Sequence, residues 1–266
     1  MQQATDFREE SRVLAAVLEP LAEADFFAVT QFKGWSIDDV IGHLHIFNHA
    51  AALALKDGDL FHAFFADMSK IMKSGGSMID AQRPWLDGLK GRALFEAWRD
   101  LSEGVADAFF VADPKARLAW AGPSMSARSS ITARQMETWA HGHEVFDLLG
   151  VSRVEKDLVK NIVVLGVNTF GWAYQVRGLD VPPQMPFLEL TAPSGDIWAF
   201  GEESDDRVVG SAVGFAQAVT QTRHWTDTNL RVLGDGARGW MDIAQCFAGG
   251  VAPPPVAGTR FKNVKA

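Results

Sequence analysis

A glutamate and a histidine four residues apart, Glu137 and His141, constrain this chain more than any other feature of its sequence. They lie in residues 134–147, a stretch with no proline and few β-branched residues, and Gly150 follows where a helix would end. On a helix, this spacing stacks the two side chains on one face, one turn apart. A carboxylate beside an imidazole makes half of a divalent-metal site. The pair alone is more often a surface contact, so the metal hypothesis needs a third ligand.

His43 is the best candidate for that third ligand. Ser36 and Asp39 have the spacing of a capping box, with Asp in place of the usual Glu or Gln, which predicts a helix that begins at Ser36. At about 100° per residue, His43 falls on the edge of an apolar stripe formed by Val40, Leu44, Phe47 and Ala51. The stripe should face the interior of a helical bundle. The alternative is an ordinary interior histidine with its hydrogen bonds satisfied.

The neighbouring histidines are predicted not to be ligands. His45 and His49 fall about 200–240° from His43 around the helix, on its far side. His141 falls about 40° from Glu137, whereas His143 falls about 240° from it. Only one histidine of each helix therefore shares a face with the expected site.

Together these segments resemble a known family. Gly34-Trp35-Ser36 leading to His43-Leu44, and then Met136-Glu137-Thr138-Trp139-Ala140-His141-Gly142, is similar to the DinB-like superfamily. Within it, the chain most resembles the mycothiol-dependent maleylpyruvate isomerase group and its uncharacterised metal-binding relatives. The resemblance covers most of the chain. It implies an α+β protein, in which an N-terminal DinB-like four-helix bundle precedes a small α+β C-terminal domain, and it implies that His43, Glu137 and His141 bind zinc.

Hydrophobic periodicity and turn residues extend this picture along the chain. We expect a metal-binding helical bundle over residues 1–150, a small α+β domain over 151–250 and a loosely packed or partly disordered tail over 251–266. Helices are predicted at 5–23, 36–56, 60–72, 88–110, around 134–147, and at 156–174, 211–224 and 238–248. Strands are predicted at 187–192, 197–200, 207–210 and 229–233. The first two strands form a hairpin, and the order of elements indicates an antiparallel α+β domain.

Composition excludes several kinds of protein. The 266 residues carry a net charge of −8 without a cluster of Lys or Arg, so no nucleic-acid surface is expected. No apolar run approaches the length of a membrane span, and the charged N-terminal residues do not form a signal peptide. Cys246 is the single cysteine, which excludes intramolecular disulfides and cysteine-rich metal sites. We therefore expect a cytoplasmic protein, and analogy with DinB-like relatives adds a homodimer.

The ligand set indicates a catalytic rather than a structural metal. Two imidazoles and one carboxylate are typical of open zinc sites, whereas closed structural sites prefer four ligands rich in cysteine. The resemblance implies a zinc-dependent isomerase or transferase that uses a low-molecular-weight thiol such as mycothiol on a small, carboxylate-bearing substrate. The alternative is a non-catalytic metal-binding or stress-related protein of the same superfamily.

Three further residues have two interpretations each. The resemblance implies that Arg223 is a catalytic residue that holds the substrate carboxylate, but an arginine at a helix C-terminus is equally expected to face the helix dipole. Relatives suggest that Glu144 orients His141, and the alternative is a solvated residue on the helix surface. Arg134, one turn before Glu137, is expected either to pair with that carboxylate or to meet an anionic substrate.

Overall fold

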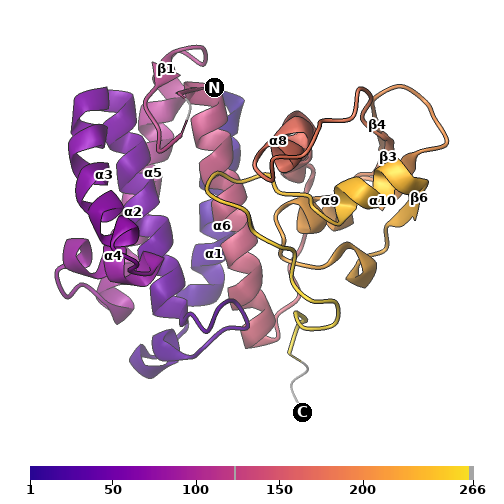
Figure 1. The fold of residues 1–266 in the computed structure, drawn as a ribbon. Helices are drawn as coiled ribbons and strands as arrows, with labels where there is room; N and C mark the ends of the chain where they lie inside the picture. The colour runs from indigo at the N-terminus through magenta and orange to yellow at the C-terminus, as the bar shows by residue number, and fades with distance from the viewer. Residues whose placement is uncertain (123, 264–266) are drawn as a thin grey trace. The chain divides into compact units, whose positions relative to one another are not determined.

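The computed structural model describes residues 1–122 and 124–263, and the chain divides into two compact units, Met1–Leu148 and Leu149–Ala266 (Figure 1). The first unit is almost entirely helical, and the second combines helices with a small sheet. The predicted fold class, a helical bundle followed by a small α+β region, is confirmed. None of the described helices combines the length and the apolar character that a bilayer crossing requires.

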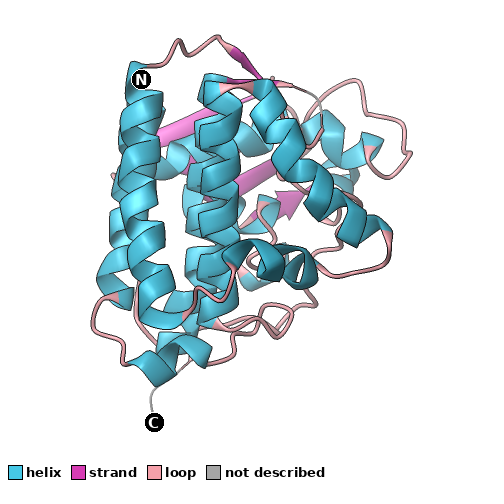
Figure 2. Ribbon diagram, turned by 90° about the vertical axis from the view of Figure 1, so that its left-hand side faces the viewer, coloured by secondary structure: helices cyan, strands magenta, loops and turns pink. Residues whose placement is uncertain are grey.

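The first unit is a bundle of long helices that lie side by side (Figure 2). Helix α5 packs against both α1 and α2, and α2 also contacts α3 and α4. A pair of antiparallel strands, each of two residues, leads into α6. The elements are α1 (Gln2–Leu18), α2 (Ile37–Lys56), α3 (Gly58–Lys73), α4 (Met78–Leu86), α5 (Gly91–Val111), β1 (Arg117–Leu118), β2 (Met125–Ser126) and α6 (Ala127–Leu149).

Two of these helices begin with the same capping arrangement. The Ser36 hydroxyl accepts a hydrogen bond from the Asp39 amide at 3.1 Å, and the Asp39 carboxylate accepts one from the Ser36 amide at 3.0 Å. The predicted start of α2 is thereby confirmed. Ser77 and Asp80 repeat the arrangement at the start of α4, a helix that the sequence analysis does not predict. Each box satisfies amides that a helix start leaves without partners.

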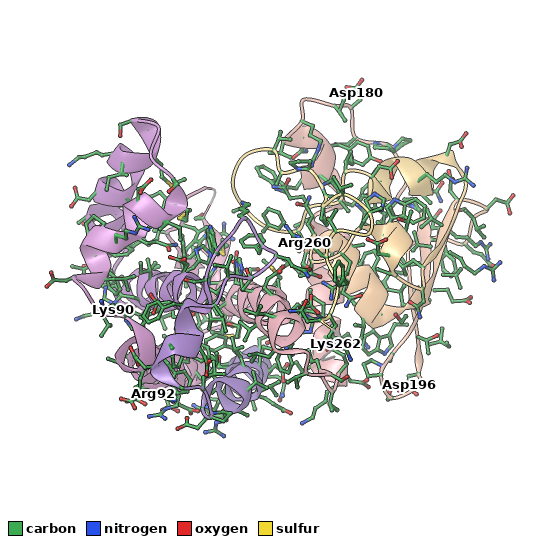
Figure 3. All side chains as sticks on the ribbon, turned by 90° about the horizontal axis from the view of Figure 1, so that it is seen from below. Lys90, Arg92, Asp180, Asp196, Arg260 and Lys262 are labelled. Carbon is green, nitrogen blue, oxygen red and sulfur yellow. The ribbon has the colours of Figure 1, made fainter. Side chains whose placement is uncertain are left out.

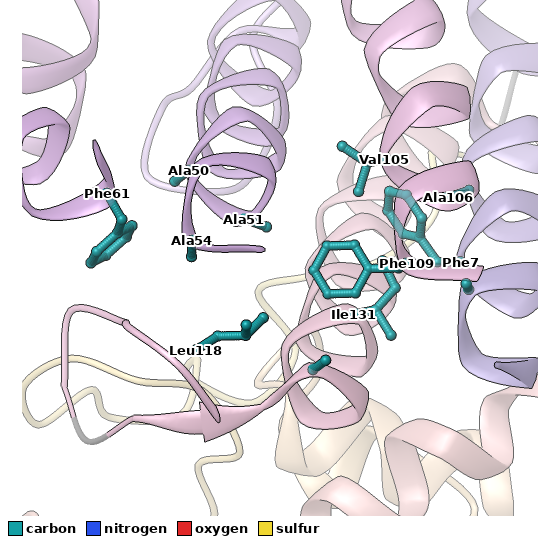
Figure 4. Packing of buried hydrophobic residues seen from close by; sticks show 12 residues of the cluster. Phe7, Ala50, Ala51, Ala54, Phe61, Val105, Ala106, Phe109, Leu118 and Ile131 are labelled. Atoms are coloured by element: carbon teal, nitrogen blue, oxygen red, sulfur yellow. The ribbon is translucent and has the colours of Figure 1, made fainter. Parts of the chain in front are cut away.

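One apolar cluster joins the N-terminal part of α1 to the C-terminal parts of α2 and α5 and to the start of α6 (Figure 4). Phe7, Phe61 and Phe109 are its largest fully buried members. Small residues of α2, Ala50, Ala51 and Ala54, lie between the larger side chains. This packing fixes α6 relative to α2, so the two helices that carry the predicted metal ligands belong to one rigid core.

The second unit contains a four-stranded sheet of order β4-β3-β5-β6. Its elements are η2 (Asp157–Val159), α7 (Lys160–Asn168), α8 (Phe170–Gln175), β3 (Phe187–Thr191), β4 (Ile197–Phe200), β5 (Arg207–Ser211), α9 (Ala212–Val219), η3 (Trp225–Asp227), β6 (Arg231–Leu233) and α10 (Asp235–Met241). The predicted β3-β4 hairpin is present and is antiparallel.

Two local predictions for this unit are wrong. The sheet is mixed, because residues 201–206 carry the chain past β3 and β5 then pairs with β3 in parallel. The helix expected over 156–174 is divided, and α7 ends where the Thr169 hydroxyl donates to the Leu165 carbonyl at 2.8 Å. A serine or threonine that bonds back to the previous turn favours such bends.

The C-terminal residues up to 263 are held to the second unit rather than packed loosely. The Ala252 carbonyl accepts hydrogen bonds from Arg177 at 2.6 Å and Gln221 at 2.8 Å. Arg260 donates to the Gln221 carbonyl at 2.8 Å, and Lys262 donates to the Ser152 hydroxyl at 2.7 Å; Figure 3 labels both. Residues 264–266 of the expected tail, like Pro123 in the loop before α6, lie outside the described residues.

Candidate metal centre

The structure brings His43 of α2 together with Glu137 and His141 of α6. One potential ligand atom of each lies within 4.8 Å of the other two. The Glu137 Oε2 atom is 3.4 Å from His43 Nε2 and 3.3 Å from His141 Nε2. The side chains of the three residues are 10%, 20% and 12% exposed for His43, Glu137 and His141, so the cluster is mostly buried but still reached by solvent.

Two of these distances fit a tetrahedral metal ion. Zinc binds imidazole nitrogen and carboxylate oxygen at about 2.0–2.2 Å, so two ligand atoms of one tetrahedron lie roughly 3.3–3.6 Å apart. The two measured separations from Glu137 fall in that range, and all three ligand atoms lie within 4.8 Å of one another. The donor set is also one that zinc and other divalent transition metals accept. Three protein ligands would leave one position for a small molecule.

The electrostatics of the cluster favour the protonation states that a metal requires. Burial lowers the pKa of His43 to about 4, against the opposing effect of Glu137, so its imidazole is neutral at pH 7. Burial would raise the pKa of Glu137, but its contacts with His141 and His43 and the charge of Arg134 hold that pKa well below its ordinary value. A neutral imidazole and an ionised carboxylate are both ready to bind a cation.

Gln82 is a site residue that the sequence analysis misses. Its amide Nε2 lies 2.7 Å from His43 Nδ1, and its side chain is buried. It lies on α4, which approaches α2 closely at Gly42. A side chain at that position would be crowded, since a Cβ there would lie only 3.0 Å from the Leu86 side chain. The Ser77 and Asp80 capping box is the signal in the sequence that would have located this helix.

Arg134 lies one turn before Glu137 and is almost fully buried, with a side chain that is 3% exposed. Its Nη2 atom is 4.0 Å from Glu137 Oε1, the oxygen that does not face the histidines. The guanidinium lies 5.5 Å from the ring centre of Phe47 and 5.1 Å from that of Trp120. Arg134 is therefore a charged neighbour of the cluster within an aromatic surrounding.

Aromatic rings from the segment before α2 cover the two histidines. Trp35 stacks on His141, with ring centres 5.8 Å apart and planes 10° from parallel, and it lies 5.3 Å from the His43 ring. Phe32 meets His141 edge-on at 5.0 Å. Lys33 and Gly34 adopt positive φ angles of 52° and 71°, which turn the chain between the two rings. This wall restricts the orientations that the imidazoles can take.

The other histidines of these helices lie outside the cluster. His45 and His49 both pack against Trp85 of α4, with ring centres 5.5 and 4.9 Å away. The His143 Nδ1 atom is 2.9 Å from the Trp139 carbonyl one turn earlier. Each therefore has contacts of its own, and among the described residues none of the three joins the cluster of His43, Glu137 and His141.

The remaining candidates have different environments. Glu144 is 2% exposed, so its interpretation as a solvated surface residue is wrong. Arg223 lies in the second unit, after α9, where its Nη1 donates to the Thr222 carbonyl at 2.9 Å. A contact between Arg223 and a substrate stays a prediction.

Known proteins resemble this chain in sequence and in fold. The family model for the mycothiol maleylpyruvate isomerase N-terminal domain matches residues 7–146. Uncharacterized proteins from two strains of Mycobacterium tuberculosis are each 39% identical over 248 residues, which cover 92% of this chain and 94% of theirs. Crystal structures of the mycothiol-dependent maleylpyruvate isomerase and of a histidine-to-alanine mutant match with TM-scores of 0.51 and 0.52. These two are 16% and 17% identical and cover 82% of this chain and 87% of theirs, which shows a common fold.

Proposed function

Because this chain belongs to the family of the mycothiol maleylpyruvate isomerase N-terminal domain, we propose that it is a divalent-metal-dependent enzyme of the maleylpyruvate isomerase-like group. The family that the sequence motifs indicate is confirmed. The finer proposal is a thiol-dependent isomerase or transferase with zinc at His43, Glu137 and His141 and a small, carboxylate-bearing substrate.

The observation that carries this proposal is the geometry of the three donors. The separations of 3.3 and 3.4 Å from Glu137 to the two histidines suit one small cation, and no fourth His, Cys, Asp or Glu of the described chain joins them. When bound there, a divalent ion would lower the pKa of a thiol in the remaining position and so keep its sulfur nucleophilic at neutral pH. This is chemistry that a low-molecular-weight thiol cofactor needs.

The chain's own residues would hold the reacting groups and limit access of water. Trp35 and Phe32 cover the histidines on one side, and Phe47 and Trp120 flank Arg134 on another. In the isomerisation, a thiolate adds to one carbon of a cis double bond conjugated to a carbonyl, which takes up the electron pair. The adduct rotates about the new single bond. Loss of the same thiolate restores the double bond as the trans isomer, so the thiol is regenerated.

The test combines metal content with thiol-dependent turnover. The purified chain should hold about one zinc per molecule, and it should convert maleylpyruvate only when a thiol such as mycothiol is added. Removal of the metal with a chelator should abolish turnover, and added zinc should restore it. Full zinc occupancy without turnover on any cis-alkene or thiol-acceptor substrate would favour the non-catalytic metal-binding protein instead. Absence of metal in the native chain would contradict both.

A further inference from the structure

Arg134 has hydrogen-bond donors that the described part of the chain does not satisfy. Its Nε and Nη1 atoms are inaccessible to solvent and have no hydrogen-bond partner among the described residues. Its Nη2 atom lies 4.0 Å from Glu137 Oε1, which is too far for a hydrogen bond. A buried guanidinium with open donors is costly, because it loses water without gaining acceptors. Such a group is a functional-site candidate when it adjoins a site.

The surroundings of Arg134 do not remove this cost. Phe47 and Trp120 lie near the guanidinium and favour the cation, but a ring cannot replace an acceptor for the N–H groups. Among the described residues, Glu137 is the carboxylate paired with Arg134, and it also faces His43 and His141. With a divalent cation at those three residues, the cation and Arg134 together would carry more positive charge than Glu137 offsets, so the site would be strongly positive. A positive, partly dry site favours an anion.

We propose that Arg134 is a substrate-binding residue that donates hydrogen bonds to a carboxylate of the ligand at the metal centre. The planar guanidinium is the side chain best suited to a carboxylate, because charge-assisted hydrogen bonds join the two groups in fixed geometry. The inference rests on the proposed function for the metal and for the carboxylate-bearing substrate, and it adds the residue that holds the carboxylate, Arg134 beside Glu137. The competing role is structural, in which Arg134 only offsets the charge of Glu137.

Binding of a small carboxylate separates the two roles. We would measure the Kd of maleate, and of its uncharged diamide, for the zinc-loaded protein by calorimetry. The variants are Arg134→Gln and Arg134→Lys, and Arg128→Gln is the matched control, since Arg128 is an exposed arginine on the same helix. Zinc affinity and Tm are measured for every variant. In the wild type, the Nε–H resonance of Arg134 is followed by NMR as maleate is added.

If Arg134 binds the carboxylate, the wild type should bind maleate more tightly than the diamide. Arg134→Gln should raise the Kd of maleate about tenfold or more without a matching change in the Kd of the diamide. Arg134→Lys keeps the charge but loses the planar fork, so it should recover only part of the affinity. Arg128→Gln should bind maleate like the wild type. The Arg134 Nε–H resonance should shift as maleate saturates the site.

A structural role gives a different pattern. Arg134→Gln would then lower the zinc affinity or the Tm, while the zinc-loaded variant would keep the wild-type preference for maleate. The Nε–H resonance of the wild type would not shift when maleate is added. That pattern would overturn the proposal. The NMR titration uses the wild type, so it decides the question even if the variants fail to fold. Arg134-dependent carboxylate binding without thiol-dependent turnover would contradict the proposed reaction but would still support the role of Arg134.

Discussion

Gln82 on α4 holds the ring of His43 on α2, with 2.7 Å between the amide Nε2 and the imidazole Nδ1. In this arrangement the amide donates to Nδ1, and the proton of the neutral ring is on Nε2, the atom that faces Glu137. A metal at Nε2 needs the other tautomer. A half-turn of the amide would present Oε1 to an Nδ1–H group, so Gln82 can support both states of the site.

Removal of this contact should weaken metal binding. We expect Gln82→Leu to raise the Kd for zinc about 10- to 100-fold, the usual effect of losing a group that orients a ligand histidine. Gln82→Glu keeps an acceptor for Nδ1–H and should bind zinc at least as well as the wild type. Competition with a chromophoric chelator measures both values. Equal affinity for the Leu and Glu variants would show that Gln82 only fills space.

The ligands themselves should be indispensable. His43→Ala and His141→Ala should each lose stoichiometric zinc, because two remaining donors cannot hold the ion against buffer and solvent. His49→Ala is the matched control, since His49 lies on the same helix as His43 but packs against Trp85. Inductively coupled plasma mass spectrometry of the purified variants gives the occupancy. Full occupancy in His43→Ala would remove the central inference about the site.

Acid should destabilise the first unit through His45. Burial, with a smaller contribution from His49, lowers its pKa from 6.5 to about 4. Between these pH values the unfolded chain binds a proton at His45 that the folded chain does not. The free energy of unfolding is therefore unaffected by His45 above about pH 6.5 and decreases as the pH falls toward 4. The loss amounts to at most about 3 kcal/mol.

Urea unfolding of the chelator-treated protein at several pH values tests this. His45→Phe keeps a ring against Trp85 but cannot be protonated, so its stability should fall less steeply than that of the wild type between pH 6.5 and 4. His43 also has a lowered pKa and contributes to the slope of both proteins, which is why the difference between them is the relevant quantity. Parallel curves would show that His45 does not titrate differently on folding.

Substitution of Phe109 should destabilise the core that supports the site, whereas substitution of its neighbour Phe110 should not. Phe109 is fully buried in the apolar cluster, whereas Phe110 is 56% exposed. Phe109→Ala should cost about 3–5 kcal/mol of unfolding free energy through lost burial and the cavity left behind. Phe110→Ala should change it by less than about 0.5 kcal/mol. Similar losses for both variants would mean that the cluster is not the core of this unit.

The helical part of the fold was predictable because its signals are local. The capping box at Ser36, the phase of His43 and the four-residue spacing of Glu137 and His141 all depend on residues within two or three turns. The residues that surround the site were harder to predict. Gln82 reaches His43 from a short helix with Pro84 inside it, and Trp35, just before α2, stacks on His141 of α6. Such contacts depend on tertiary packing, which no periodicity records.

The sheet of the second unit shows the same limit. Alternating residues located β3 and β4 closely, and the turn between them indicated a hairpin. The direction of β5 depends instead on which side of β3 the chain returns to, a matter of six loop residues and of global topology. The end of α7 was missed because the residue at the break is a threonine, Thr169, which bonds to carbonyls of its own helix, and not a proline or glycine.

The three donors are unequally distributed along the chain, and this has a consequence for how the protein is assembled. Glu137 and His141 meet as soon as one helix forms, but His43 joins them across 94 residues. Closing such a loop has an entropic cost that only the completed core repays. A partly folded chain or an isolated helix offers two donors and holds an ion weakly. Tight metal binding would therefore require the whole bundle to be folded, and a newly made chain would bind its ion only after the bundle has formed.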